Sequence, residues 1–172
     1  MNTRKGDKSI LERIQLSAEI YGDQAAIRTS FGEITYSELW EKSNGLAAYL
    51  EERLGENKEP IIVYGHKDPL MIVCFLACVK SGRAYCPVDL SMPKNRIEEI
   101  AHTVGNPLIL AVEDLKLDGF FVLGRSTIEE IKPMKENDSQ YWVKDHDLFY
   151  IIFTSGSTGK PKGVQITCQN LS

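Results

Sequence analysis

A strongly apolar helix between two β-type segments is the feature that most limits how this chain can fold. Residues 60–64 form a continuous apolar run, Pro-Ile-Ile-Val-Tyr, which is typical of a strand covered on both faces. Asp68 and Pro69 then supply a helix N-cap and a proline at the first helical position, and Gly82 marks the helix end. Residues 84–88 are the next predicted strand. This strand–helix–strand order favours a parallel sheet with helices packed on it.

The same alternation continues along the rest of the chain. We expect helices over residues 10–21, over 35–55, opened by a Thr35-x-x-Glu38 capping box, and over 93–104. Further strands are predicted at 25–29, near 34, and at 108–112, 120–123, 148–153 and 164–166. The polar stretch 125–144 is expected to hold a helical turn around Ile128 and then a mobile connection. The sequence therefore predicts an α/β fold, with a mostly parallel sheet and helices on both faces.

Composition narrows the possible partners. The 172 residues fit one domain, with 42% hydrophobic and 26% charged residues. A net charge of −4 without a basic stripe argues against nucleic acid as a partner. The most apolar stretch, residues 69–79, is shorter than the roughly 20 residues that a bilayer requires, so we expect no integral membrane segment. We do not expect the charged N-terminus to be a signal peptide, and four cysteines without metal-ligand spacing fit a structural role in a reducing cytoplasm.

Residues 154–163, Thr-Ser-Gly-Ser-Thr-Gly-Lys-Pro-Lys-Gly, carry the clearest chemical signal. They lie between two predicted strands. Glycines allow the backbone to approach a ligand closely, and successive N–H groups then form a concave site for an anion. Hydroxyl groups add donors and lysine adds positive charge. The segment is suited to surround phosphate groups.

Two well-known phosphate loops do not fit these residues. A Walker A loop needs Gly-Lys-Ser/Thr at a fixed distance and a helix after it, but Pro161 occupies the sixth position counted from Gly156. A Rossmann loop needs a third glycine and a helix, and neither follows Gly159. A plain turn without a ligand remains the alternative on composition alone.

The full string resembles the phosphate-binding signature of the adenylate-forming superfamily, which includes acyl-CoA synthetases, luciferases and peptide-synthetase adenylation domains. This resemblance implies the corresponding partial fold and a loop that closes over the phosphates of ATP. It implies that phosphate would accept hydrogen bonds from Thr154, Ser155, Ser157 and Thr158. Gly156 and Gly159 would shape the loop, and Lys162 would stabilise it or its anionic ligand. Lys160 lies at a variable position of the signature and receives no role.

A second segment narrows the resemblance. Residues 78–89 are similar to a motif of the amino-acid-activating branch, in which Asp89 is expected to fix a turn. Within that branch the chain most resembles the family of D-alanine–D-alanyl carrier protein ligases, over nearly its whole length. The resemblance implies that ATP and Mg²⁺ convert D-alanine into an acyl-adenylate. The D-alanyl group would then pass to the phosphopantetheine thiol of a D-alanyl carrier protein, for the D-alanylation of teichoic acids in the cell envelope.

The resemblance also predicts that residues 1–172 are the N-terminal part of an adenylation domain, truncated and without its C-terminal domain. We expect this fragment alone to have no adenylation activity, because the nucleoside and amino-acid pockets lie further along the chain in the family. No catalytic residue and no metal ligand is assigned within it, and His66, His102 and His146 are expected to be structural or solvated. Two alternatives stay open: a peptide-synthetase adenylation domain for another amino acid, and a non-catalytic fragment.

Overall fold

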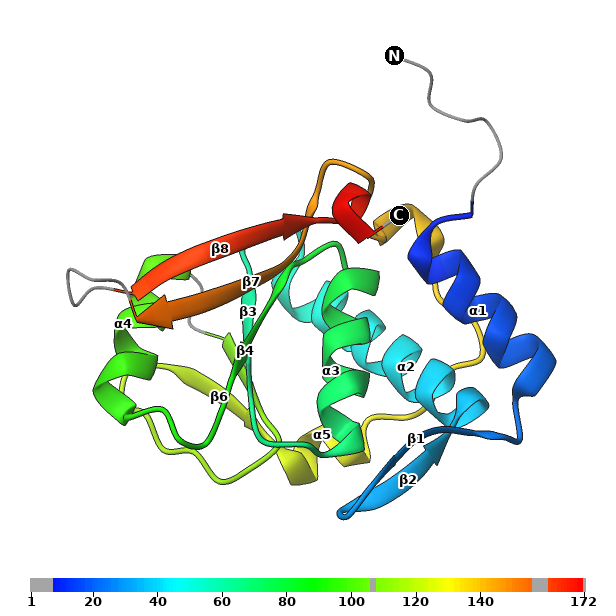
Figure 1. The fold of residues 1–172 in the computed structure, drawn as a ribbon, viewed down its shortest axis with the longest axis horizontal. Coiled ribbons are helices and arrows are strands. Elements are labelled where there is room, and N and C mark those ends of the chain that lie inside the picture. Colours follow the sequence, from blue (N-terminus) through cyan, green and yellow to red (C-terminus); the bar gives the residue numbers. More distant parts are fainter. Residues whose placement is uncertain (1–7, 106–107, 156–160, 172) are drawn as a thin grey trace.

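The structure is a computed structural model that describes residues 8–105, 108–155 and 161–171 (Figure 1). The helices are α1 Ile10–Tyr21, α2 Tyr36–Leu54, α3 Pro69–Lys80, α4 Lys94–Val104 and α5 Arg125–Glu130, with 3-10 helices η1 Ser139–Tyr141 and η2 Cys168–Leu171. The strands are β1 Ala25–Thr29, β2 Gly32–Thr35, β3 Ile61–Tyr64, β4 Tyr85–Val88, β5 Leu108–Ala111, β6 Phe121–Gly124, β7 Leu148–Ser155 and β8 Pro161–Thr167. These elements confirm the predicted order, with ends that differ by at most a few residues.

Six of the strands form one sheet, in the order β6-β5-β3-β4-β7-β8. The first five of these strands pair in parallel, and only β7 and β8 are antiparallel. Strands β1 and β2 form a separate antiparallel pair beside α2 (Figure 1). The prediction of an α/β fold with a mostly parallel sheet is confirmed.

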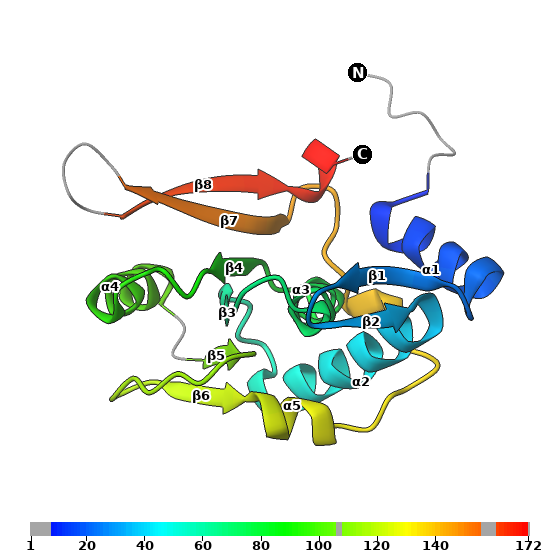
Figure 2. The ribbon, with the colours of Figure 1, turned by 60° about the horizontal axis from the view of Figure 1, so that its bottom comes forward.

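Helices cover both faces of the sheet (Figure 2). Neighbouring residues of a strand point to opposite faces, and in β3 they join two different clusters. Ile61 and Val63 pack with residues of α2 and α3, whereas Ile62 and Tyr64 pack with residues of α4. This two-sided burial explains why the strand is continuously apolar in the sequence.

Side-chain caps fix the starts of two helices, α2 and α3. The Thr35 hydroxyl accepts from the Glu38 backbone N–H at 3.2 Å, and the Glu38 carboxylate accepts from the Thr35 N–H at 2.9 Å, so the predicted capping box is confirmed. Asp68 caps α3 by accepting from the Leu70 N–H at 2.8 Å. Pro69 follows at the first helical position, where its missing N–H costs nothing.

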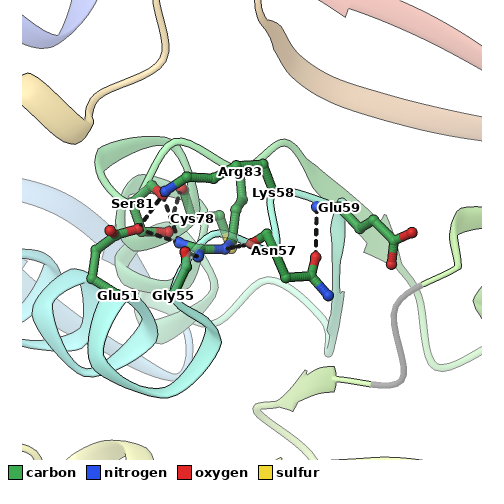
Figure 3. A network of polar contacts seen from close by, with 8 residues as sticks. All are labelled: Glu51, Gly55, Asn57, Lys58, Glu59, Cys78, Ser81 and Arg83. Atoms are coloured by element: carbon green, nitrogen blue, oxygen red, sulfur yellow. Dashed lines mark hydrogen bonds and ion pairs between the residues drawn. The ribbon is translucent and has the colours of Figure 1, made fainter.

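A fully buried arginine closes the C-terminal end of α2 (Figure 3). Arg83 donates to the carbonyl oxygens of Gly55 and Asn57, each at 2.7 Å, and of Ser81 at 2.6 Å. The same guanidinium forms an ion pair with Glu51, which lies in the last turns of α2. These contacts join the end of α2 to the segment between α3 and β4.

The connection after α5 differs from the expectation of a mobile segment. Asn44 of α2 is fully buried and donates through Nδ2 to the carbonyl oxygens of Met134 at 3.0 Å and Lys135 at 3.1 Å. Further along, Trp142 is buried with its ring edge-on to Trp40, with the ring centroids 5.8 Å apart. The segment is polar in sequence because it lies at the surface, but its backbone is anchored to the core.

Candidate phosphate-binding hairpin

The segment with the phosphate-type sequence lies on an antiparallel hairpin made of β7 and β8. Figures 1 and 2 show the two strands running side by side. The register places Phe153 opposite Gly163, Thr154 opposite Lys162 and Ser155 opposite Pro161. The element after the loop is therefore a strand, as predicted, and not the helix that a Walker A or Rossmann loop requires.

The hairpin has one packed face and one open face. Ile151 and Phe153 pack against the cluster that contains residues of α4. The alternate residues, Ile152 and Thr154, are exposed. Since directly opposite residues of an antiparallel pair lie on the same face, Thr154 and Lys162 lie together on the open face.

The chemistry of this pair suits an anion. Thr154 Oγ1 lies 3.5 Å from the Lys162 carbonyl oxygen, at the long limit of a hydrogen bond, so the hydroxyl is available to a better acceptor. The Lys162 side chain is exposed, and no described carboxylate forms an ion pair with it. A hydroxyl donor and an unneutralised ammonium group can both bind a phosphate oxygen.

Only part of the predicted site lies within the described residues. Thr154 and Lys162 face the same side of the hairpin, and the backbone of Ser155 extends β7. The other predicted residues, Gly156, Ser157, Thr158 and Gly159, lie outside the described residues. The assignment of all seven to phosphate therefore stays a prediction.

Asp89 fixes a turn, as expected. Its Oδ1 accepts from the Ser91 N–H at 3.0 Å, and its Oδ2 lies 2.5 Å from His66 Nδ1. The Ser91 N–H and then the imidazole hold the pKa of the Asp89 carboxyl at about 2, below its usual range. His66 follows β3 and Asp89 follows β4, so the pair joins the ends of two adjacent parallel strands.

The cysteines and histidines form no metal site within residues 8–105, 108–155 and 161–171. No three His, Cys, Asp or Glu side chains gather there in a way that could hold an ion. All four cysteines are buried. Burial raises the pKa of the Cys74 and Cys78 thiols, and that of Cys86 to about 12, which fits the expected structural role. Within the same ranges, no helix has the length and apolar character needed to cross a bilayer.

A buried lysine inside the motif at 78–89 was not predicted from the sequence. Lys80 Nζ donates to Ser43 Oγ and Asn44 Oδ1, each at 2.7 Å, and to the Trp40 carbonyl oxygen at 3.3 Å. Helical spacing could have revealed it, because Lys80 lies three and four residues after the buried Ala77 and Leu76. Its contacts are to protein groups of α2, so it supports the fold.

Comparison with known proteins assigns the chain to a family. The family described as AMP-binding enzyme matches residues 14–172. Among curated proteins, the D-alanine–D-alanyl carrier protein ligase of Bacillus licheniformis is 41% identical over 169 residues, which cover 94% of this chain and 33% of that protein. The ligase of the same name from Listeria monocytogenes is 43% identical over 171 residues, covering 95% of this chain and 34% of the relative. This chain spans about a third of the length of the curated relatives it matches.

Solved structures agree on the fold. The N-terminal subdomain of NpsA from Klebsiella oxytoca, in complex with 3-hydroxyanthranilyl-AMSN, matches 95% of this chain and 41% of its own length, at 25% identity and a TM-score of 0.79. PA1221, a peptide-synthetase protein containing adenylation and carrier domains, matches 93% of this chain and 28% of its own length, at 26% identity and a TM-score of 0.77. The six-stranded sheet is therefore the architecture found in the N-terminal subdomain of adenylation domains.

Proposed function

We propose that this chain, which belongs to the AMP-binding enzyme family, is the N-terminal part of an ATP-dependent ligase that activates D-alanine. In this proposal residues 154–163 hold the phosphates of ATP. Thr154, Ser155, Ser157 and Thr158 donate hydrogen bonds to them, Gly156 and Gly159 shape the loop, and Lys162 supplies positive charge. The observation that carries the proposal is the placement of Thr154 opposite Lys162 on the open face of the β7–β8 hairpin.

The described residues fit a polyphosphate. Lys162 has an exposed ammonium group that no described carboxylate neutralises, and Thr154 has a weakly used hydroxyl. The described residues offer no cluster of acidic side chains for a divalent ion. Mg²⁺ is proposed to arrive with the nucleotide, held mainly by phosphate oxygens, which is a common arrangement for this ion.

The proposed reaction begins with attack of the D-alanine carboxylate on the α-phosphorus of ATP, with pyrophosphate as the leaving group. ATP supplies the electrophile and the leaving group. The chain's own contribution is to position the β- and γ-phosphates and to neutralise the charge that grows on them. The activated D-alanyl group would then pass to the phosphopantetheine thiol of a D-alanyl carrier protein, for use in teichoic acid D-alanylation.

The choice of D-alanine is supported by relatives that are 41–43% identical and carry the name of D-alanine–carrier protein ligases. The rival enzymatic proposal is a peptide-synthetase adenylation domain for another amino acid. It is supported by the likeness to PA1221, at a lower identity of 26%. A third possibility from another class is a fragment that binds polyanions without catalysis.

Amino-acid-dependent exchange of labelled pyrophosphate into ATP would test the choice of substrate. The protein should be expressed from its whole natural reading frame and assayed with D-alanine, L-alanine and a panel of other amino acids. Exchange that D-alanine stimulates most supports the ligase. Stimulation by a different amino acid supports the peptide-synthetase alternative, and no exchange with any of them supports the non-catalytic one.

A further inference from the structure

We infer that Phe153 and Gly163 act together as a register lock for the hairpin, and that this lock puts Lys162 on the open face. The inference rests on the proposed phosphate site, because it explains how that site is oriented. The two residues lie directly opposite one another in β7 and β8, next to the pair formed by Thr154 and Lys162.

Steric crowding at position 163 explains why this residue is a glycine. It does not have a positive φ, so its backbone conformation would accept any residue. A Cβ at this position would lie 2.9 Å from Ile151 Cγ2 and 3.2 Å from Phe153 Cε1. The Phe153 ring therefore covers the glycine across the strands, a pairing in which an aromatic side chain compensates for a glycine in a sheet.

A second set of contacts also holds Phe153 in place. It packs against the cluster of apolar residues that includes Ile97 and Ile100 of α4. The ring is thus in contact with the helix side of the hairpin and with the flat surface at Gly163. This arrangement fixes which residue of β8 can lie under the ring.

A hypothetical one-residue shift of the β7–β8 register shows what the pairing of Phe153 with Gly163 prevents. Side chains alternate between the two faces of a strand, so a slip of one residue exchanges the faces of the whole strand. In β8 such a slip would turn Lys162 toward the packed face beside Phe153 and move Gly163 to the open face. Lys162 would then leave the side of Thr154, and its Cβ would meet the Phe153 ring at the place that Gly163 now occupies. The glycine and the lysine next to it therefore favour the same register.

The substitution Gly163→Val distinguishes the proposed register lock from the intrinsic β-strand preference of the residue at position 163. Valine favours strands more than glycine does, so preference alone would predict a more stable hairpin. The lock predicts the opposite, since the valine methyl groups would collide with Phe153 and Ile151. Gln165→Val is the matched control: it introduces the same residue on the same face of β8, opposite Ile151 and two residues away.

Two readouts should be measured on the 172-residue chain. The first is the set of cross-strand NOEs between residues 153 and 163 and between 154 and 162, recorded without ligand. The second is the Kd for inorganic pyrophosphate, followed by NMR titration. We expect Gly163→Val to lose these NOEs and to raise the Kd by about fivefold or more, whereas Gln165→Val keeps both close to the unmodified chain.

The outcomes separate the lock from the proposed function. Retained NOEs and an unchanged Kd in Gly163→Val would overturn the lock while leaving the phosphate site intact. Absence of pyrophosphate binding by the unmodified chain would contradict the proposed function, and the NOEs would still decide the register. If Gly163→Val does not fold, Gly163→Ala carries the same test, because its Cβ meets the same Ile151 and Phe153 atoms without the two methyl groups of valine.

Discussion

The ammonium nitrogen of Lys80 lies 3.3 Å from the centre of the Trp40 ring, inside the contact between α2 and α3. The three hydrogen atoms of this group match three acceptors, on Ser43, on Asn44 and on the Trp40 backbone. The ring and the acceptors favour the charged form. Burial opposes it and lowers the pKa of Lys80 to about 6, from 10.5 for an ordinary lysine.

This depressed pKa predicts how stability depends on pH. Between pH 6 and about 10 the unfolded chain binds more protons at Lys80 than the folded chain does, so the free energy of unfolding should rise with pH in this window. The upper limit for one proton is about 1.4 kcal/mol per pH unit. Urea unfolding at several pH values between 6 and 9 would measure it. Lys80→Met should flatten this part of the profile, and an identical slope in the two proteins would show that Lys80 stays charged.

Arg83 is predicted to be essential for stability. Arg83→Met would remove the side-chain donor from the carbonyl oxygens of Gly55 and Asn57. Ser81 and Glu51 would lose the buried guanidinium and keep only the partly exposed Lys58 as a partner. Breaking a buried ion pair from one side costs about 3–5 kcal/mol, and because Lys58 still faces Glu51 the expected loss lies near the lower end of this range. Chemical denaturation would measure this loss. Arg28→Met is the matched control, because the ion pair of Arg28 with Glu33 is exposed and its loss should not be measurable. Equal effects of the two substitutions would contradict the assignment.

Gly45 tests the anchoring of the connection after α5. Replacing a glycine inside a helix by alanine usually stabilises a protein by about 1 kcal/mol. At Gly45, however, a Cβ would lie 2.1 Å from the Lys132 carbonyl oxygen. Gly45→Ala should therefore destabilise the protein, by roughly 1–3 kcal/mol, and should raise proteolysis of the connection. Gly124→Ala, whose added Cβ meets nothing within 4 Å, is the control and should change stability by less than about 0.5 kcal/mol. If Gly45→Ala were instead more stable than the unmodified protein, the connection after α5 would not be anchored against α2.

The elements that could be predicted from the sequence are those indicated by residues close together in the chain. The capping box at Thr35 and Glu38, the Asp68 cap and the doubly covered strand β3 each depend on residues within a few positions of one another. The phosphate-type string was also recognisable, because its glycines, hydroxyls and lysine lie in one short segment. The element after it was correctly predicted as a strand.

Contacts between distant segments could not be predicted in this way. The anchoring of Met134 and Lys135 by Asn44 joins residues about 90 positions apart, and nothing near either segment signals it. The same holds for the acceptors of Lys80, which come from α2. Polar residues in a segment usually indicate that the segment is exposed to solvent. A prediction made on that basis is wrong for the few polar residues that are buried with all their hydrogen bonds made. The face that Lys162 occupies depends on register, which only the pairing of β7 with β8 defines.

The most direct test of the central claim is the Kd of the 172-residue chain for inorganic pyrophosphate, compared between the unmodified protein and Lys162→Ala. Lys116→Ala is the control, since it removes another exposed lysine that lies outside the hairpin. If residues 154–163 hold phosphates, Lys162→Ala should raise the Kd by about tenfold, because a charge-assisted contact is lost, while Lys116→Ala leaves it unchanged. Equal Kd values for all three proteins, or no binding by the unmodified chain, would contradict the account.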